Sequence, residues 1–194
     1  QIRSSAASDV YKRQKLGFGA SRTMRIAQKL YEGVNIGSET TGLITYMRTD
    51  GVQLSSQAIE ELREEIINRH GKDYIPQIPR VYKSKAANAQ EAHEAIRPTS
   101  ISRDPEDMSQ YLDTEQLKLY ELIWKRTISS QMQSAELDET SADISNKDMS
   151  IVFRANGSQV SFPGFFIYRD REDDKILPKL LENNKVDLQK ADGE

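Results

Sequence analysis

The sequence predicts a mixed α+β fold, with a helix-rich part first and an antiparallel, β-rich part after it. Apolar residues recur at helical spacing in several stretches before residue 133, whereas the stretches after residue 134 are short, β-favouring and separated by turn residues. A hydrophobic fraction of 37% with 29% charged residues is typical of a globular chain. We therefore expect two structural units, 15–133 and 134–194, after a leader over 1–14 that follows no clear period.

The first unit is expected to begin with a helix and a strand. Ser21 is placed to cap a helix whose apolar side includes Leu30 and Tyr31, and Gly33 is placed to end it. Residues 43–47 are apolar and β-favouring and lie between a glycine and a turn, which predicts a short strand.

The rest of the first unit is expected to be mainly helical. Capping residues, apolar periodicity and the helix-ending residues glycine and proline set the expected boundaries. The expected elements are a helix from Ser55 or Ser56 to His70, a loop over 73–88, a short helix over 89–97 ended by Pro98, and a long helix that begins at Thr114 and buries Trp124.

The second unit is expected to be built from strands. Residues 150–154 and 158–162 flank Ala155-Asn156-Gly157, and Asn-Gly is a strong signal for a two-residue hairpin turn. Residues 165–169 and 185–189 also have strand-like composition.

Composition excludes several classes of site. Cysteine is absent, which excludes disulfides and cysteine-bound metals, and no apolar run approaches the roughly 20 residues that span a bilayer. A cytoplasmic protein with no membrane contact is therefore expected. The net charge of −3 argues against a strongly basic nucleic-acid binder, but the acidic excess lies after residue 100, so a polyanion site is expected before it.

Tyr46 and Arg48 form a candidate phosphoryl-transfer pair. In a strand, residues two apart project from the same face. A phenol, with a pKa of about 10, is a poor nucleophile unless its anion is stabilised, and a neighbouring guanidinium can favour the anion and bind phosphate oxygens. The Thr49 hydroxyl can add a donor, and Asp50 can hold Arg48 in place. From spacing alone, a structural tyrosine beside a surface arginine is the commoner arrangement.

A family resemblance changes that balance. Residues 42–50, Gly-Leu-Ile-Thr-Tyr-Met-Arg-Thr-Asp, resemble the active-site signature of bacterial DNA topoisomerase I, a type IA enzyme. Residues 16–33 and 90–98, the latter Gln-Glu-Ala-His-Glu-Ala-Ile-Arg-Pro, match the same family in order and at similar spacing. Met47 favours this branch, because the topoisomerase III branch usually has proline after the tyrosine.

The resemblance assigns further site residues. It implies that Tyr46 is the nucleophile, that Arg48 assists it, and that His93 contacts DNA in the active site. If 89–97 is helical, Gln90, His93 and Arg97 share one face that can hold a phosphate. The resemblance also implies that Arg97 contacts a phosphate. The His-Glu-x-x-Arg order lacks the second histidine of a zinc motif, so no metal site is expected in this chain.

The resemblance also implies a function. Type IA enzymes cut single-stranded segments of negatively supercoiled DNA, hold the 5′ end as a transient phosphotyrosine, pass the other strand and reseal the break without ATP. Their Mg²⁺ is held by a toprim domain, and no stretch of this chain resembles one.

We therefore expect a monomeric fragment that is inactive alone. Its unit 15–133 is expected to be the tyrosine-bearing gate domain, and 134–194 part of the β-rich arch domain. Residues 1–14 do not resemble the family and are interpreted as a foreign leader or an artefact of sequence assembly.

Two alternatives remain open. One is a non-catalytic, helix-rich DNA-binding module in which Tyr46 is structural. The other is a topoisomerase III or reverse gyrase relative. The sequence does not determine DNA sequence preference, the source organism, or whether the fragment binds DNA or folds stably alone.

Overall fold

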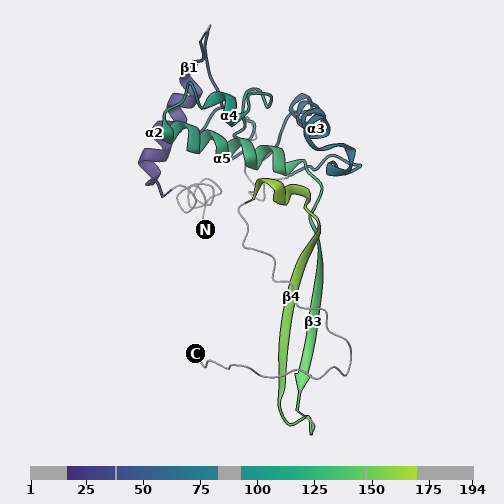
Figure 1. The fold of residues 1–194 in the computed structure, drawn as a ribbon. Helices are drawn as coiled ribbons and strands as arrows, with labels where there is room; N and C mark the ends of the chain where they lie inside the picture. The colour runs from purple at the N-terminus through teal and green to yellow at the C-terminus, as the bar shows by residue number, and fades with distance from the viewer. Residues whose placement is uncertain (1–16, 38, 83–92, 147, 170–194) are drawn as a thin grey trace. The chain divides into compact units, whose positions relative to one another are not determined.

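The computed structural model describes residues 17–37, 39–82, 93–146 and 148–169, which form two compact units divided between Gln133 and Ser134 (Figure 1). Helices before residue 133 and a hairpin after it confirm the predicted mixed α+β class. The first unit contains, in chain order, α2 (Ala20–Glu32), β1 (Val34–Asn35), β2 (Thr40–Thr41), α3 (Ser56–His70), the 3-10 helix η1 (Lys72–Tyr74), α4 (Pro105–Met108) and α5 (Thr114–Ser130). The second contains β3 (Glu136–Ser145), β4 (Val152–Phe162) and the 3-10 helix η2 (Gly164–Tyr168).

Helix α5 supplies much of the first unit's core. Its buried residues recur at helical spacing, and α2 and α4 both pack against it. The predicted burial of Trp124 is confirmed, because this side chain is 2% exposed and its indole Nε1 donates to the Ile101 carbonyl oxygen at 2.8 Å. No helix among the described residues is long and apolar enough to cross a membrane.

The helix ends follow capping chemistry, with two shifts from the predicted positions. Helix α3 is capped by Ser55, whose hydroxyl accepts from the Ala58 amide, as predicted. The cap of α5 is Asp113 rather than Thr114, because the Asp113 carboxylate accepts from two amides of the first turn. Helix α2 begins two residues earlier than predicted, with Gly19 in place of Ser21 as its N-cap residue.

The predicted helix stops are confirmed at two glycines. Gly33 follows α2 with φ 137° and Gly71 follows α3 with φ 95°, and each amide donates back to a carbonyl of the last turn. These positive φ values suit glycine, which has no Cβ to clash. The loop predicted over 73–88 contains the end of η1, and its residues 83–88 lie outside the described residues.

Two predicted elements near the candidate site are wrong. Residues 43–47 form a single β-bridge, between Ile44 and Pro98, in place of a strand. In the predicted helix over 89–97, residues 93–97 are not helical, and 89–92 lie outside the described residues. In both stretches the backbone bonds to a distant part of the chain, which competes with a local strand or helix.

The second unit is one long antiparallel hairpin, and its turn is not where the Asn-Gly signal placed it. Asn156 and Gly157 lie inside β4, opposite Ser141 and Thr140 of β3. The chain reverses between the two strands, where the Asn146 side chain accepts from the Ile151 amide at 3.1 Å. The stretches 150–154 and 158–162, predicted as two strands, therefore belong largely to one.

The stretch after the hairpin also differs from the prediction. Residues 165–169 were expected to form a strand, but the chain turns into η2, where the Phe166 amide donates to the Pro163 carbonyl oxygen at 2.9 Å. Pro163 has no amide hydrogen to donate to a strand ladder, and Gly164 has a positive φ of 46°, so neither residue favours a strand here. The predicted strand over 185–189 lies outside the described residues.

Replacement of Trp124 by alanine is expected to lower the free energy of unfolding of the chain by about 3–5 kcal/mol, because it opens a cavity in the α5 core and leaves the Ile101 carbonyl without its donor. The matched control on the same helix is Lys125→Ala, which removes an exposed ion pair with Glu121 and should change stability by less than about 0.5 kcal/mol. Urea unfolding followed by circular dichroism measures both. Equal effects of the two changes would contradict the proposed core.

Candidate active site around Tyr46

The stretch that carries Tyr46, residues 43–51, is called here the tyrosine segment. Its first residue is bound to the end of α2, where the Leu43 amide donates to the Leu30 carbonyl oxygen at 2.7 Å. Just before it, a Cβ added to Gly42 would lie 2.5 Å from the Tyr31 carbonyl oxygen, so the close approach to α2 requires glycine. Leu43 and Ile44 are buried and hold the segment in the core.

A second stretch, residues 93–99, is called here the histidine segment and runs antiparallel to the tyrosine segment. The Thr45 amide donates to the Arg97 carbonyl oxygen at 2.9 Å, and the Thr99 amide donates to the Leu43 carbonyl oxygen at 3.0 Å. The Thr45 hydroxyl donates to the Ala95 carbonyl oxygen at 2.8 Å and accepts from the Arg97 amide at 2.9 Å. Thr45 therefore joins the two segments and has little capacity left for a ligand.

The pairing brings the rings of Tyr46 and His93 together. Their centroids lie 5.1 Å apart with planes inclined by 39°. A third ring, that of Tyr31 at the end of α2, lies 5.5 Å from the Tyr46 ring in an edge-on arrangement at 68°. Gly51 touches the histidine segment so closely that any Cβ there would overlap the His93 carbonyl oxygen. Tyr46 is half-buried and His93 is exposed, so this cluster lies at the surface.

Arg48 and Asp50 are both exposed. Because residues 45–48 bend and do not form a strand, strand geometry no longer places Tyr46 and Arg48 on one face. Within the described part of the chain Arg48 makes no ion pair, with Asp50 or with any other acid. Its guanidinium is thus available to an anion from outside.

Thr49, Arg97 and Gln90 are the other predicted site residues. The Thr49 hydroxyl accepts from the Gly51 amide at 2.9 Å and so shapes the turn after Tyr46. Arg97 is largely buried and lies 3.1 Å from Glu94, measured from Nε to the carboxylate Oε1, while its Nη1 donates to the Pro98 carbonyl oxygen at 2.9 Å. Gln90 lies outside the described residues, and contact of any of the three with phosphate stays a prediction.

Glu94 connects the histidine segment to α3. Its carboxylate accepts from the Ser55 amide at 2.7 Å, at the start of that helix. Burial acts to raise the pKa of Glu94, but the hydrogen bonds from Arg97 and Ser55 outweigh it and hold the pKa below its ordinary value of 4.5. Neither Glu94 nor Tyr31 was singled out from the sequence as a site residue. Tyr31 was identified there only as part of an apolar helix side, and the contacts that matter join distant residues.

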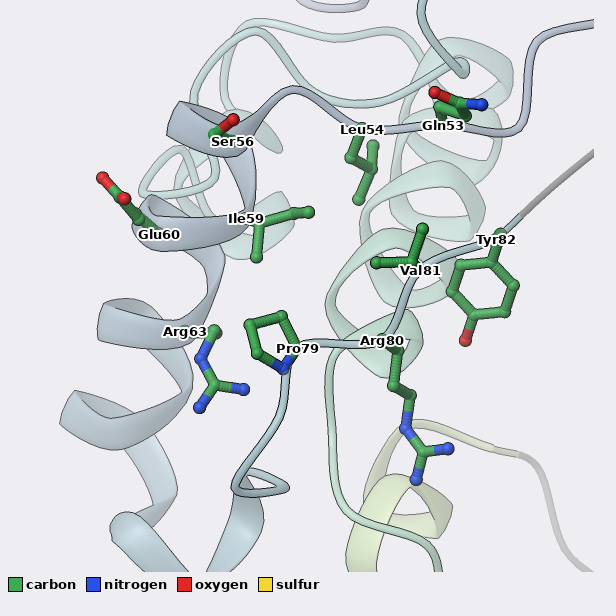
Figure 2. A pocket seen from close by; sticks show the side chains of 10 residues that line it. All are labelled: Gln53, Leu54, Ser56, Ile59, Glu60, Arg63, Pro79, Arg80, Val81 and Tyr82. Atoms are coloured by element: carbon green, nitrogen blue, oxygen red, sulfur yellow. The ribbon is translucent and has the colours of Figure 1, made fainter.

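A pocket of about 390 Å³ lies between the start of α3 and residues 79–82 (Figure 2). The apolar side chains of Leu54, Ile59 and Val81 face into it, and none of the rings around Tyr46 lines it. Its complete lining is Gln53, Leu54, Ser56, Ile59, Glu60, Arg63, Pro79, Arg80, Val81 and Tyr82.

Metal-binding chemistry is not evident around Tyr46. Among the described residues, no three histidine or acidic side chains cluster as metal ligands. Near Tyr46, Asp50 is a single exposed carboxylate and Glu94 is engaged by Arg97 and Ser55, so these residues do not fit a magnesium site, which needs several oxygen ligands.

The chain is similar to DNA topoisomerases in both sequence and structure. The family model described as DNA topoisomerase matches residues 10–194. DNA topoisomerase 1 of Rickettsia bellii is 53% identical over 180 residues, covering 89% of this chain and 22% of that protein. DNA topoisomerase 1 of Helicobacter pylori is 46% identical over 179 residues, covering 92% of this chain and 24% of that protein. The structure of full-length topoisomerase I from Thermotoga maritima superposes with a TM-score of 0.78 at 36% identity, covering 94% of this chain and 29% of that one.

The fold of this chain, a helix-rich unit followed by a hairpin, is similar to that of a solved topoisomerase I. The chain belongs to the type IA DNA topoisomerase family, on the bacterial topoisomerase I branch. It spans about a quarter of the length of the relatives it matches.

Glu94 provides a test of the contact between the histidine segment and α3. Because its pKa is lowered in the folded chain, its ionised form contributes stability above about pH 4.5, and that contribution is lost as the pH falls through the lower folded value. Glu94→Gln should therefore cost about 1 kcal/mol at pH 7 and less at pH 3. Urea unfolding at both pH values measures the difference. Glu60→Gln, at an exposed position, is the control. A loss of stability in Glu94→Gln that did not shrink at pH 3 would contradict the role assigned to the ionised Glu94.

Proposed function

We propose that this chain carries the DNA-cutting half of a type IA topoisomerase active site, with Tyr46 as the nucleophile. The observation that carries the proposal is the contact of the Tyr46 ring with the His93 ring, at 5.1 Å, because it joins the two stretches that resemble the family's active site. The exposed Arg48, without an ion pair among the described residues, lies two positions after Tyr46. Tyr46 is half-buried, so its side chain is held by the protein and still open to a strand from outside.

The proposed reaction exchanges one phosphodiester bond for another. The Tyr46 phenol oxygen forms a bond to phosphorus, the bond from phosphorus to the 3′ oxygen of the neighbouring nucleotide breaks, and the proton of the phenol ends on that 3′ oxygen. The reverse reaction reseals the strand, which explains why no ATP is required. A passage of the other strand between the two steps relaxes negatively supercoiled DNA.

The side chains around Tyr46 are assigned to three tasks in this reaction. Arg48 stabilises the phenolate and the non-bridging phosphate oxygens, as a guanidinium does for a developing anion. His93, whose ring contacts that of Tyr46, binds the phosphate. Thr49, Arg97 and Gln90 are proposed as further DNA contacts. In the proposed enzyme, Mg²⁺ held by a toprim domain would neutralise phosphate charge.

The wider assignments follow from the same proposal. Residues 15–133 would be the gate domain and 134–194 part of the arch domain of a monomeric, cytoplasmic enzyme that binds single-stranded segments of DNA.

The second candidate function is a non-catalytic DNA-binding module in which Tyr46 is only a packing residue. The partial exposure of Tyr46 favours the catalytic role, as does the Arg48 guanidinium, which has no ion pair with another described residue.

The Tyr46→Phe variant of the intact enzyme that contains this chain is expected to form no covalent protein–DNA adduct, because phenylalanine keeps the ring but lacks the attacking oxygen. The measurement is an adduct trapped by denaturation after incubation with a labelled single-stranded oligonucleotide. Tyr111→Phe, in an exposed tyrosine of the same unit, is the matched control and should cleave normally. An adduct that persisted in Tyr46→Phe would favour the packing role.

The chain alone is expected neither to cleave nor to relax DNA in the presence of Mg²⁺, because the described residues near Tyr46 do not fit a magnesium site. Relaxation of a negatively supercoiled plasmid, followed on an agarose gel, measures this. Addition of a separately produced toprim domain tests whether activity is restored. Multiple-turnover relaxation by the purified chain would refute the prediction.

A further inference from the structure

We infer that Tyr31, at the end of α2, is a positioning residue that holds the Tyr46 ring in the orientation needed for attack. The inference rests on the proposed role of Tyr46. Its basis is the edge-on contact between the two rings, whose centroids lie 5.5 Å apart at 68°. Edge-to-face pairs at this distance are attractive because the positive edge of one ring meets the negative face of the other.

The backbone of Tyr31 is fixed against the tyrosine segment on two sides. The preceding residue, Leu30, is fully buried and its carbonyl oxygen accepts from the Leu43 amide at 2.7 Å. The Tyr31 carbonyl oxygen faces Gly42 so closely that a Cβ there would lie 2.5 Å away. The base of the Tyr31 side chain therefore has a set position relative to Tyr46, and its ring can act as a fixed support.

The exposure of Tyr31 distinguishes it from the core residues of α2. It is 41% exposed, whereas Leu30 is fully buried, so Tyr31 contributes little to the core. Its hydroxyl makes no hydrogen bond to any other described residue, so the ring carries the interaction that the structure records. The role assigned to Tyr31 is therefore contact with Tyr46 through its ring.

The Tyr46 ring needs such a support because its segment is neither strand nor helix. Attack on phosphorus requires the phenol oxygen to be in line with the bond that breaks, and a displacement of about 1 Å can cost about a hundredfold in rate. His93 contacts the same ring, so two aromatic neighbours restrict its rotation. Loss of one of them should reduce the rate of cleavage while leaving DNA binding intact.

The test uses the intact enzyme that contains this chain, with a saturating single-stranded oligonucleotide and single-turnover kinetics. Tyr31→Leu, which keeps an apolar side chain but removes the ring, should lower the cleavage rate constant about tenfold, with Kd for the oligonucleotide within about twofold of the unchanged enzyme. Tyr31→Phe keeps the ring and should cleave within about twofold of the unchanged enzyme. Tyr111→Leu, at an exposed tyrosine away from this cluster, is the matched control and should have no effect.

Three results would overturn the inference. These are that Tyr31→Leu cleaves at the unchanged rate, that Tyr31→Phe is as slow as Tyr31→Leu, or that the loss lies in Kd with the rate constant unchanged, which would make Tyr31 a DNA contact. Tyr46→Phe in the same series separates this inference from the proposed function. If that variant forms no adduct and Tyr31→Leu cleaves normally, only the positioning role is wrong, whereas an adduct in Tyr46→Phe removes the proposed function itself.

Discussion

The Thr45 hydroxyl donates to the Ala95 carbonyl oxygen and accepts from the Arg97 amide, both in the histidine segment. These partners are at least 50 positions away from Thr45 in the sequence. Together with the bridge between Ile44 and Pro98, these bonds hold two irregular stretches side by side. Neither stretch has a helix or sheet of its own to satisfy its backbone groups. The contact between the Tyr46 and His93 rings depends on this pairing, so the site is built by hydrogen bonds to the backbone rather than by the side chains that give it chemistry.

Structural features that depend on local chemistry could be predicted from the sequence, whereas features that depend on contacts between distant residues could not. Helices α3 and α5 follow from apolar spacing and from caps within one residue of those expected, and the burial of Trp124 follows from the same spacing. The apolar residues around Ile44 predicted a strand. They are apolar because the tyrosine segment is buried between α2 and the histidine segment, which does not require a strand. The prediction of a turn at Asn156-Gly157 was wrong, because β4 stays paired with β3 through these two residues. Tyr31 and Glu94 matter through distant partners, which spacing does not reveal.

Several charged side chains among the described residues form ion pairs. Arg22 is engaged by Glu115, and Arg97 by Glu94, in ion pairs between or within the described elements. A net charge of −3 therefore says little about the surface that a phosphate would meet. The exposed guanidinium of Arg48 has no such partner among the described residues. Recognition of DNA at Tyr46 would thus depend on placement of single charges and less on a broad basic face.

The hairpin of β3 and β4 has a further physical consequence. Its strands of ten and eleven residues pair only with each other among the described residues, and most of their side chains are exposed. A two-stranded ribbon is marginally stable in water, and each outer edge presents unpaired amides and carbonyls. Acidic residues in β3, including Glu136 and Asp138, oppose stacking of like edges. Without other strands or partner segments to cover them, these edges are templates for self-association, so concentrated solutions of the separated unit should be prone to aggregate through added strands.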